Sequence, residues 1–267
     1  PLRRQRQMCI RDSGYSVAAN EVTFATGAKF SLYTFFMAVV NPGDEVIIPT
    51  PYWVSYGDQV KMAEGVPVFV QAKEDNHFKV TVEQLEAART DKTKVLVLNS
   101  PSNPTGMIYS REELMAIGNW AVAHDVLILA DDIYGRLVYN GNEFVPISSL
   151  SEAIRKQTIV INGVSKAYAM TGWRVGYAVG NPEIIAAMSK LTGQTTSNLT
   201  AVSQYATIEA LTGPQDSVET MRQAFEERLN TIYPLLCQVP GFEVVKPQGA
   251  FYLFPNVKKA MEMKGYT

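Results

Sequence analysis

Residues 163–176 read Gly163-Val164-Ser165-Lys166-Ala167-Tyr168-Ala169-Met170-Thr171-Gly172-Trp173-Arg174-Val175-Gly176. They follow an apolar run at residues 158–161, which predicts a short buried strand. Asn162-Gly163 is then expected to turn the chain and to present the Lys166 amine at the carboxyl end of that strand. A lone lysine in a glycine-rich loop is usually a solvated surface residue. A role for Lys166 therefore depends on what the rest of the chain places near it.

Strand-like and helix-like segments alternate along the chain. The strand-like runs are residues 46–49, 66–70, 95–98, 126–130, 158–161 and 175–179, and the helical patterns are 30–40, 54–62, 82–89, 111–124 and 182–191. Ser110, followed by two glutamates, is expected to cap one helix, and Thr81 with Gln84 fits a capping box. The alternation predicts a three-layer α/β fold with a mostly parallel sheet flanked by helices.

The chain is expected to divide into four parts. Residues 1–13 form a non-native or disordered flank, 14–212 a large domain, 213–239 a connecting helix, and 240–267 the truncated start of a smaller α+β domain that opens with a hairpin at 242–245 and 250–254. The chain starts with Pro1 and stops early in the small domain, so we expect a fragment. The flank has arginines but no apolar run, so it is not a signal peptide; a basic arm for nucleic acid is the alternative to a non-native flank.

The composition is typical of a soluble globular enzyme, with 46% hydrophobic and 19% charged residues. A net charge of −2 gives no electrostatic reason to expect nucleic acid or an anionic membrane as a partner. No apolar stretch approaches the length needed to span a bilayer. Two cysteines and two histidines, all far apart, do not suggest a disulfide framework or a metal site. The cytoplasm is the expected compartment.

Several polar residues follow predicted strands, where ligands of open α/β sheets bind. Asn103 lies in Ser102-Asn103-Pro104-Thr105-Gly106, where the proline restricts the backbone. Asp131 closes the apolar run 126–130 and is costly to bury without a cation; Tyr134 follows it. Taken singly, an Asn-Pro turn and a helix-capping aspartate are also ordinary structural features.

Two further segments fit an anionic, flat ligand. Gly27 and Ala28 precede an apolar helix, whose free N–H groups and dipole suit a phosphate, and Arg174 offers a counter-charge. Trp53 follows the run 46–49 and offers a flat face, although an aromatic residue there is more often part of the core. The sequence contains no G-x-x-x-x-G-K-[ST], G-x-G-x-x-G, G-x-S-x-G or H-E-x-x-H motif.

In combination these motifs resemble the class I aminotransferases, pyridoxal-phosphate enzymes of fold type I, over nearly all of residues 15–255. The resemblance implies that Lys166 forms the Schiff base and that Asp131 pairs with the pyridinium nitrogen. It makes Asn103 and Tyr134 donors to the phenolic oxygen. The other implied cofactor-binding residues are Gly27, Ala28, Lys29, Trp53, Ser165 and Arg174. It also implies a homodimer, in which the loop 193–198 reaches the cofactor phosphate of the other subunit.

The substrate is indicated by two short strings. Thr26-Gly27-Ala28-Lys29 and Pro51-Tyr52-Trp53-Val54-Ser55-Tyr56 resemble the bacterial subgroup that acts on aspartate, with prephenate or glutamate in some members. There Lys29 would pair with the distal carboxylate, with Trp53 and Asn103 also contacting substrate. Three alternatives stay open: an aromatic or broad-specificity aminotransferase, a cofactor-binding sensor domain, and a catalytically incomplete fragment, because the family's arginine for the α-carboxylate lies beyond Thr267.

Overall fold

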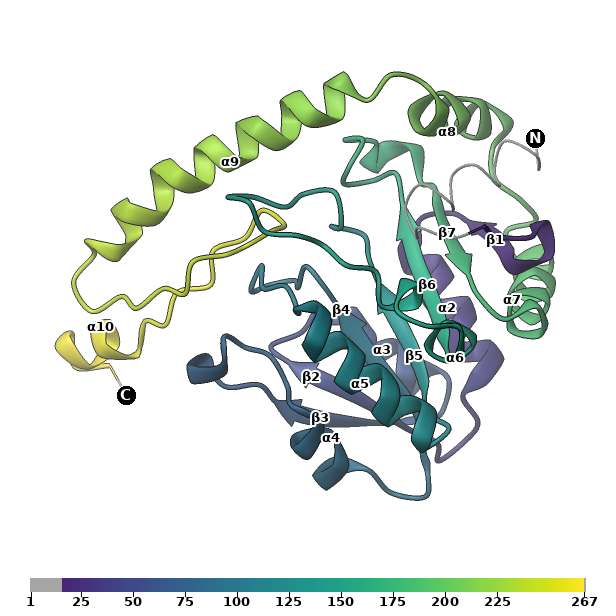
Figure 1. Cartoon of the computed structure of the whole chain (residues 1–267), viewed down its shortest axis with the longest axis horizontal. Helices are drawn as coiled ribbons and strands as arrows, with labels where there is room; N and C mark the ends of the chain where they lie inside the picture. Colours follow the sequence, from purple (N-terminus) through teal and green to yellow (C-terminus); the bar gives the residue numbers. More distant parts are fainter. Residues whose placement is uncertain (1–15, 267) are drawn as a thin grey trace.

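A seven-stranded sheet lies between two layers of helices in the computed structural model, which describes residues 16–266 (Figure 1). The strands are β1 (Val22–Ala25), β2 (Glu45–Thr50), β3 (Val66–Gln71), β4 (Thr93–Asn99), β5 (Leu127–Asp131), β6 (Thr158–Gly163) and β7 (Gly176–Val179), in the order β1-β7-β6-β5-β4-β2-β3. Strand β7 runs opposite to the other six strands, so its pairings with β1 and β6 are antiparallel and the remaining pairings are parallel. The predicted, mostly parallel sheet is therefore confirmed, whereas the predicted flank at residues 1–13 lies outside the described residues.

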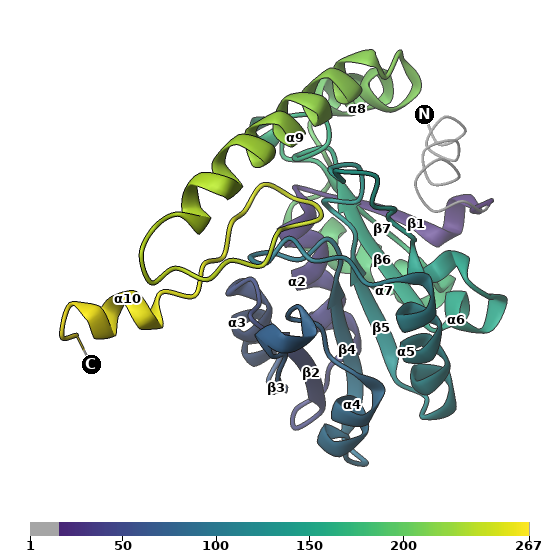
Figure 2. The same cartoon turned by 60° about the vertical axis from the view of Figure 1, so that its left-hand side comes forward.

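Helices cover both faces of the sheet, so its strands are buried on both sides (Figure 2). One face carries α2 (Ala28–Val39), α3 (Ser55–Met62) and α7 (Pro182–Thr195), and the other carries α4 (Val82–Ala88), α5 (Arg111–Ala123) and α6 (Glu152–Lys156). Alternate residues of each strand enter different cores: Leu96 packs with the α4 and α5 layer, and Val95 and Val97 pack with α2 and α3. Burial on both faces is why these strands appear in the sequence as continuous apolar runs.

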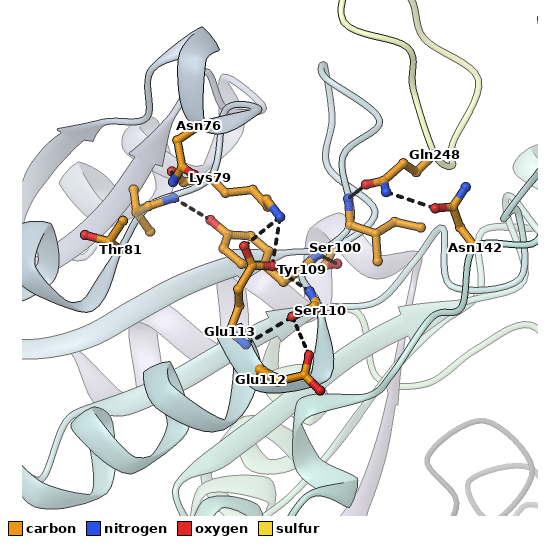
Figure 3. A network of polar contacts seen from close by, with 12 residues as sticks. Asn76, Lys79, Thr81, Ser100, Tyr109, Ser110, Glu112, Glu113, Asn142 and Gln248 are labelled. Atoms are coloured by element: carbon orange, nitrogen blue, oxygen red, sulfur yellow. Dashed lines mark hydrogen bonds and ion pairs between the residues drawn. The ribbon is translucent and has the colours of Figure 1, made fainter.

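The predicted helix caps are present. The Ser110 hydroxyl accepts the backbone N–H of Glu113 at 3.2 Å, and the Glu113 carboxylate accepts the N–H of Ser110 (Figure 3). Thr81 and Gln84 form the same reciprocal pair at the start of α4. These side chains satisfy N–H groups that the first turn of a helix leaves without partners.

Four local features differ from the sequence prediction. Asn162-Gly163 do not turn the chain; they extend β6 and pair with Tyr177 and Gly176, so the loop starts at Val164. Here pairing with a neighbouring strand outweighs the local turn preference. Strand β1 and helices α6 and α8 (Ala201–Thr212) were not predicted. Strand β1 has only four residues, and its pairing with β7 lies far away in sequence.

The C-terminal part begins with the long helix α9 (Asp216–Cys237), as predicted, and ends with α10 (Lys258–Met263) (Figure 1). The predicted hairpin is wrong: residues 242–245 and 250–254 form no regular strands, and the pairing is limited to the single bridges Glu243–Asn256 and Val138–Gly249. The backbone bonds elsewhere instead. The N–H groups of Gln248 and Gly249 both donate to the carbonyl of Gly106 at 2.9 Å.

The Gln248 side chain adds to this attachment, because its Oε1 accepts the N–H of Ile108 at 3.0 Å and its Nε2 donates to Asn142 at 2.9 Å (Figure 3). Residues 247–253 are thereby fixed beside the ends of the central strands. In residues 16–266, no helix combines the length and apolarity that crossing a lipid bilayer requires.

Candidate active site

The sheet topology brings distant loops to one edge. The carboxyl ends of β4, β5 and β6 meet there, and Asn99 pairs with Asp131. Because β7 is antiparallel, its first residue, Gly176, lies at the same edge, paired with Gly163 on one side and Ala25 on the other. The Lys166 loop, the segment before β7 and the start of α2 therefore converge.

A cavity of about 190 Å³ opens at this edge. Every site residue that the sequence predicted lines it, except Gly27, which lies directly before Ala28: the lining residues are Ala28, Lys29, Trp53, Asn103, Asp131, Tyr134, Ser165, Lys166 and Arg174. Six further residues complete the wall: Leu32, Tyr56, Asn99, Ile133, Thr171 and Tyr252. The sequence had not singled out those six for a role.

One corner of the cavity is suited to an anion. Gly27 has φ +91°, and a Cβ there would lie 2.2 Å from the Arg174 Nη2, so only glycine lets the guanidinium approach. A Cβ at Gly176 would likewise lie 2.2 Å from the backbone nitrogen of Ala28. Helix α2 begins at Ala28, and its first N–H groups have no carbonyl one turn earlier to bond. The carbonyl of Thr171 accepts from Arg174 Nη1 at 2.8 Å and orients the guanidinium toward this helix end.

Asp131 forms the floor of the cavity and is only 3% exposed. Its Oδ2 accepts the Tyr56 hydroxyl at 2.6 Å, and its Oδ1 accepts the N–H of Ile133 at 3.3 Å. Burial raises the pKa of Asp131 to about 6, while these two donors and the Lys166 ammonium act in the opposite direction. At neutral pH the carboxylate is thus mainly ionised, fixed in one orientation, and suited to a cationic partner.

Lys166 extends from the loop after β6 into the cavity and is half-buried. Its Nζ lies 5.7 Å from the ring centroid of Tyr134 and 5.3 Å from that of Phe251. Burial lowers the pKa of Lys166, the Arg174 charge lowers it further, and Asp131 opposes both. A lowered pKa increases the fraction of free amine, which is the nucleophilic form.

Asn103 and Tyr134 converge on one oxygen. The Asn103 backbone N–H donates to Asn99 Oδ1 at 2.7 Å, which fixes the loop after β4. Asn103 Nδ2 then donates to the Tyr252 hydroxyl oxygen at 3.1 Å, and the Tyr134 hydroxyl lies 2.5 Å from the same oxygen. The Asn103 amide and the Tyr134 hydroxyl, which meet at this hydroxyl oxygen, are both able to donate to a phenol-type ligand atom. No local sequence pattern points to Tyr252, since its contacts lie in distant segments.

Aromatic and cationic groups form the opposite wall. Lys29 Nζ lies 4.8 Å from the ring centroid of Trp53. The ring of Tyr56 meets Trp53 edge-on, with centroids 5.4 Å apart. Trp53 lies just before α3, and its carbonyl accepts the N–H of Tyr56, in the first turn of the helix, at 3.1 Å. This three-residue spacing, which brings the two rings together, was the signal in the sequence that pointed to Tyr56.

Comparison with known proteins gives the family. A family model described as "Aminotransferase class I and II" matches residues 7–265, and the chain belongs to this family. It is 75% identical to the asparagine–oxo-acid transaminase of Streptococcus mutans over 95% of this chain, and 57% identical to an aspartate aminotransferase of Geobacillus stearothermophilus over 96%. The crystal structure of the aspartate aminotransferase from Rhizobium meliloti superposes with a TM-score of 0.94 at 42% identity, over 97% of this chain and 65% of that one. The chain spans 65% of the length of both curated relatives.

The residues of the cavity fit pyridoxal phosphate. A partly buried amine can bind its aldehyde, and a buried carboxylate can pair with its ring nitrogen. The Asn103 amide and the Tyr134 hydroxyl, which contact the same oxygen of Tyr252, can both donate to its phenolic group. The corner that a Cβ at Gly27 would fill has the right charge for its phosphate.

Proposed function

We propose that the whole protein is a pyridoxal-phosphate-dependent aminotransferase that moves an amino group between an amino acid and a 2-oxo acid. The observation that carries this proposal is the convergence of the Lys166 amine, the Asp131 carboxylate and the cation of Arg174 beside a helix start in one cavity. Family membership and the names of the relatives support it.

Each residue has a separate task in this proposal. Lys166 would hold the cofactor covalently through its amine, and the same amine, when free, would act as the base that moves the proton at the substrate Cα. Asp131 keeps the ring nitrogen protonated. The bound cofactor supplies the electron-withdrawing ring that delocalises the negative charge formed at Cα. Asn103 and Tyr134 orient the ring through its phenolic oxygen, while Trp53 covers one of its faces.

The remaining polar groups hold the phosphate. Arg174 provides the positive charge, and the first N–H groups of α2, at Ala28 and Lys29, provide donors along the helix dipole. Ser165 lines the cavity next to Lys166, and we assign its hydroxyl to the same group. Gly27 has no side chain, which leaves room for the Arg174 guanidinium beside the start of α2.

The central experiment is reduction with borohydride in the presence of pyridoxal phosphate, followed by peptide mapping. A label on Lys166 is expected, because in the described part of the chain Lys166 and Lys29 are the lysines that line the cavity, and Lys166 interacts with the charges of Asp131 and Arg174. A label on another lysine would contradict the cofactor site. A label on Lys166 without transamination by the whole protein would instead favour a sensor or an incomplete catalytic unit.

We further propose that the substrate is aspartate or its amide. Lys29 places an ammonium at the cavity wall, where it can meet the distal group of a four-carbon substrate. One relative is named for asparagine and others for aspartate, and both substrates offer a distal oxygen. An aromatic substrate offers none, so Lys29 separates this proposal from an aromatic aminotransferase.

Substitution Lys29→Ala should reduce kcat/KM for aspartate by tenfold to more than a hundredfold, because a charged hydrogen bond contributes about 1.5–3 kcal/mol. Asparagine should lose less, since its amide carries no charge, and phenylalanine should be unaffected. Rates with all three amino acids, before and after the change, provide the measurement. Lys190, an exposed residue of α7, offers the matched control Lys190→Ala. An equal loss for aspartate and phenylalanine would assign Lys29 to the cofactor or to the fold instead.

The domain and subunit organisation also remains a proposal. We assign residues 14–212 to a large domain, 213–239 to a connecting helix and 240–267 to the start of a small domain. For the whole protein we propose a homodimer in which the loop after α7 reaches the phosphate of the other subunit. Helix α7 extends to Thr195, so this loop is shorter than the expected 193–198 and starts at Thr196. Sedimentation of the active protein should give a dimer mass, and an active monomer would contradict the shared site.

A further inference from the structure

We propose that Tyr56 is a positioning residue that keeps the Asp131 carboxylate ionised and aimed into the cavity. This inference deepens the proposed function and rests on it for its biological meaning. Tyr56 is fully enclosed, at 2% exposure, and its hydroxyl lies 2.6 Å from Asp131 Oδ2. Within residues 16–266, the other hydrogen bond to this carboxylate comes from the backbone N–H of Ile133.

The direction of the bond follows from the two acidities. Burial and the neighbouring Asp131 charge raise the pKa of Tyr56 well above 10, so the phenol stays protonated and donates. The pKa of Asp131 is lower, about 6, so the carboxylate accepts. The Tyr56 phenol is neutral, so it does not neutralise the carboxylate as a bound lysine or arginine would. The negative charge of Asp131 therefore stays available to a positively charged ligand atom.

The other groups that face Asp131 cannot replace this bond. Lys166, from the loop after β6, acts on the carboxylate through its charge and is not hydrogen-bonded to it. Tyr134, from the segment after β5, interacts with Asp131 only at longer range, and its hydroxyl is directed to Tyr252. The Ile133 N–H contact is longer, at 3.3 Å, and reaches the other carboxylate oxygen. Tyr56 alone holds Oδ2.

Tyr56 also connects two walls of the cavity. Its ring meets Trp53 edge-on, with an interplanar angle of 87°, while its hydroxyl binds Asp131. Trp53 faces the space that a flat ligand would occupy, and Asp131 lies at its edge. Tyr56 thus sets the distance between Trp53, which is proposed to cover the cofactor ring, and Asp131, which is proposed to pair with the ring nitrogen.

The test is a titration of the Asp131 carboxyl in this chain without cofactor. Aspartate is labelled with ¹³C at the carboxyl carbon, and the Asp131 signal is the one lost in Asp131→Asn. The wild-type midpoint is expected near pH 6. In Tyr56→Phe it should move upward by about one to two pH units, because the charged form loses a donor. An unchanged midpoint in a folded Tyr56→Phe protein would overturn the proposal.

The matched control is Tyr109→Phe. Tyr109 is also a buried tyrosine, but its hydroxyl accepts the N–H of Val80 at 3.0 Å, away from Asp131 (Figure 3). Removal of the Tyr109 hydroxyl should leave the titration midpoint of the Asp131 carboxyl unchanged. Circular dichroism of each variant verifies that it is folded. A shift of the same size in Tyr109→Phe would also overturn the assignment, since it would reflect general loosening.

A second measurement needs no substitution and applies even if Tyr56→Phe does not fold. In wild-type chain labelled at the hydroxyl-bearing ring carbon of tyrosine, the Tyr56 signal, assigned by its contact with Trp53, should shift at the Asp131 midpoint. A Tyr56 signal that stays constant through that midpoint would exclude the bond. Neither titration involves pyridoxal phosphate, so their outcome is independent of the Lys166 labelling that tests the proposed function.

Discussion

Substitution Lys166→Ala is expected to abolish transamination by the whole protein and to remove the borohydride label. The alanine variant loses two functions at once, because Lys166 is both the proposed covalent anchor and the proposed base. General base catalysis alone contributes about 10²–10⁴-fold in rate, so a decrease of at least about 10⁴-fold is expected when covalent capture is lost as well. Turnover with aspartate and the mass of the reduced, digested protein provide the two measurements.

Lys166→Arg tests whether the charge or the nucleophile matters. Arginine keeps the positive charge but remains protonated at any accessible pH, so it should be as inactive as alanine. Lys156→Ala is the control, since Lys156 is an exposed residue of α6 that pairs with Glu152 on the helix surface. Activity within a few-fold of wild type in either Lys166 variant would remove the basis of the proposed mechanism.

Asp131→Asn is expected to leave cofactor binding measurable and to impair turnover strongly. The amide keeps the shape of the carboxylate and can still accept from Tyr56, but it has no charge to hold a ring nitrogen protonated. Loss of a preorganised electrostatic contact of this kind costs about 3–4 kcal/mol of barrier, or on the order of 10²–10³-fold in kcat. A titration of cofactor absorbance and a kcat measurement separate the two effects.

Asp58→Asn serves as the control for this substitution, because Asp58 is an exposed aspartate of α3. It should behave as wild type in both assays. Near-normal turnover of Asp131→Asn would reduce Asp131 to a structural role, in which its hydrogen bonds to Tyr56 and Ile133 matter and its charge does not.

The sequence predicted those parts of the site that lie next to a clear strand. Asp131 and Asn103 follow buried apolar runs, and parallel strands bring such positions to one edge whatever the details of packing. Lys166 and Arg174 were predictable for the same reason, since they lie in the loop that connects β6 with β7. The sheet and its two-sided burial were predictable for the same reason.

The remaining features depend on contacts between distant segments. Tyr252 reaches the site only because residues 247–253 bond to Gly106 and Leu137 and do not form the hairpin that their strand-like pattern suggested. Strand β1 likewise exists because β7 pairs with it. Neither feature has a local sequence pattern that distinguishes it from a loop. Tyr56 is intermediate: its spacing from Trp53 was visible, but its bond to Asp131 required the helix to be placed.

The pairing of β1 with β7 has a consequence for folding. Ala25 and Gly176 pair directly, although all the other strands lie between them in the chain. Such long-range pairing closes the largest loop of the sheet and is slow and entropically costly. The corner formed by Gly27 and Arg174 exists only after this closure. A phosphate bound there would bind the closed sheet and not the open chain, and would stabilise closure by mass action. Cofactor uptake by the nascent protein would then report that β1 and β7 have paired.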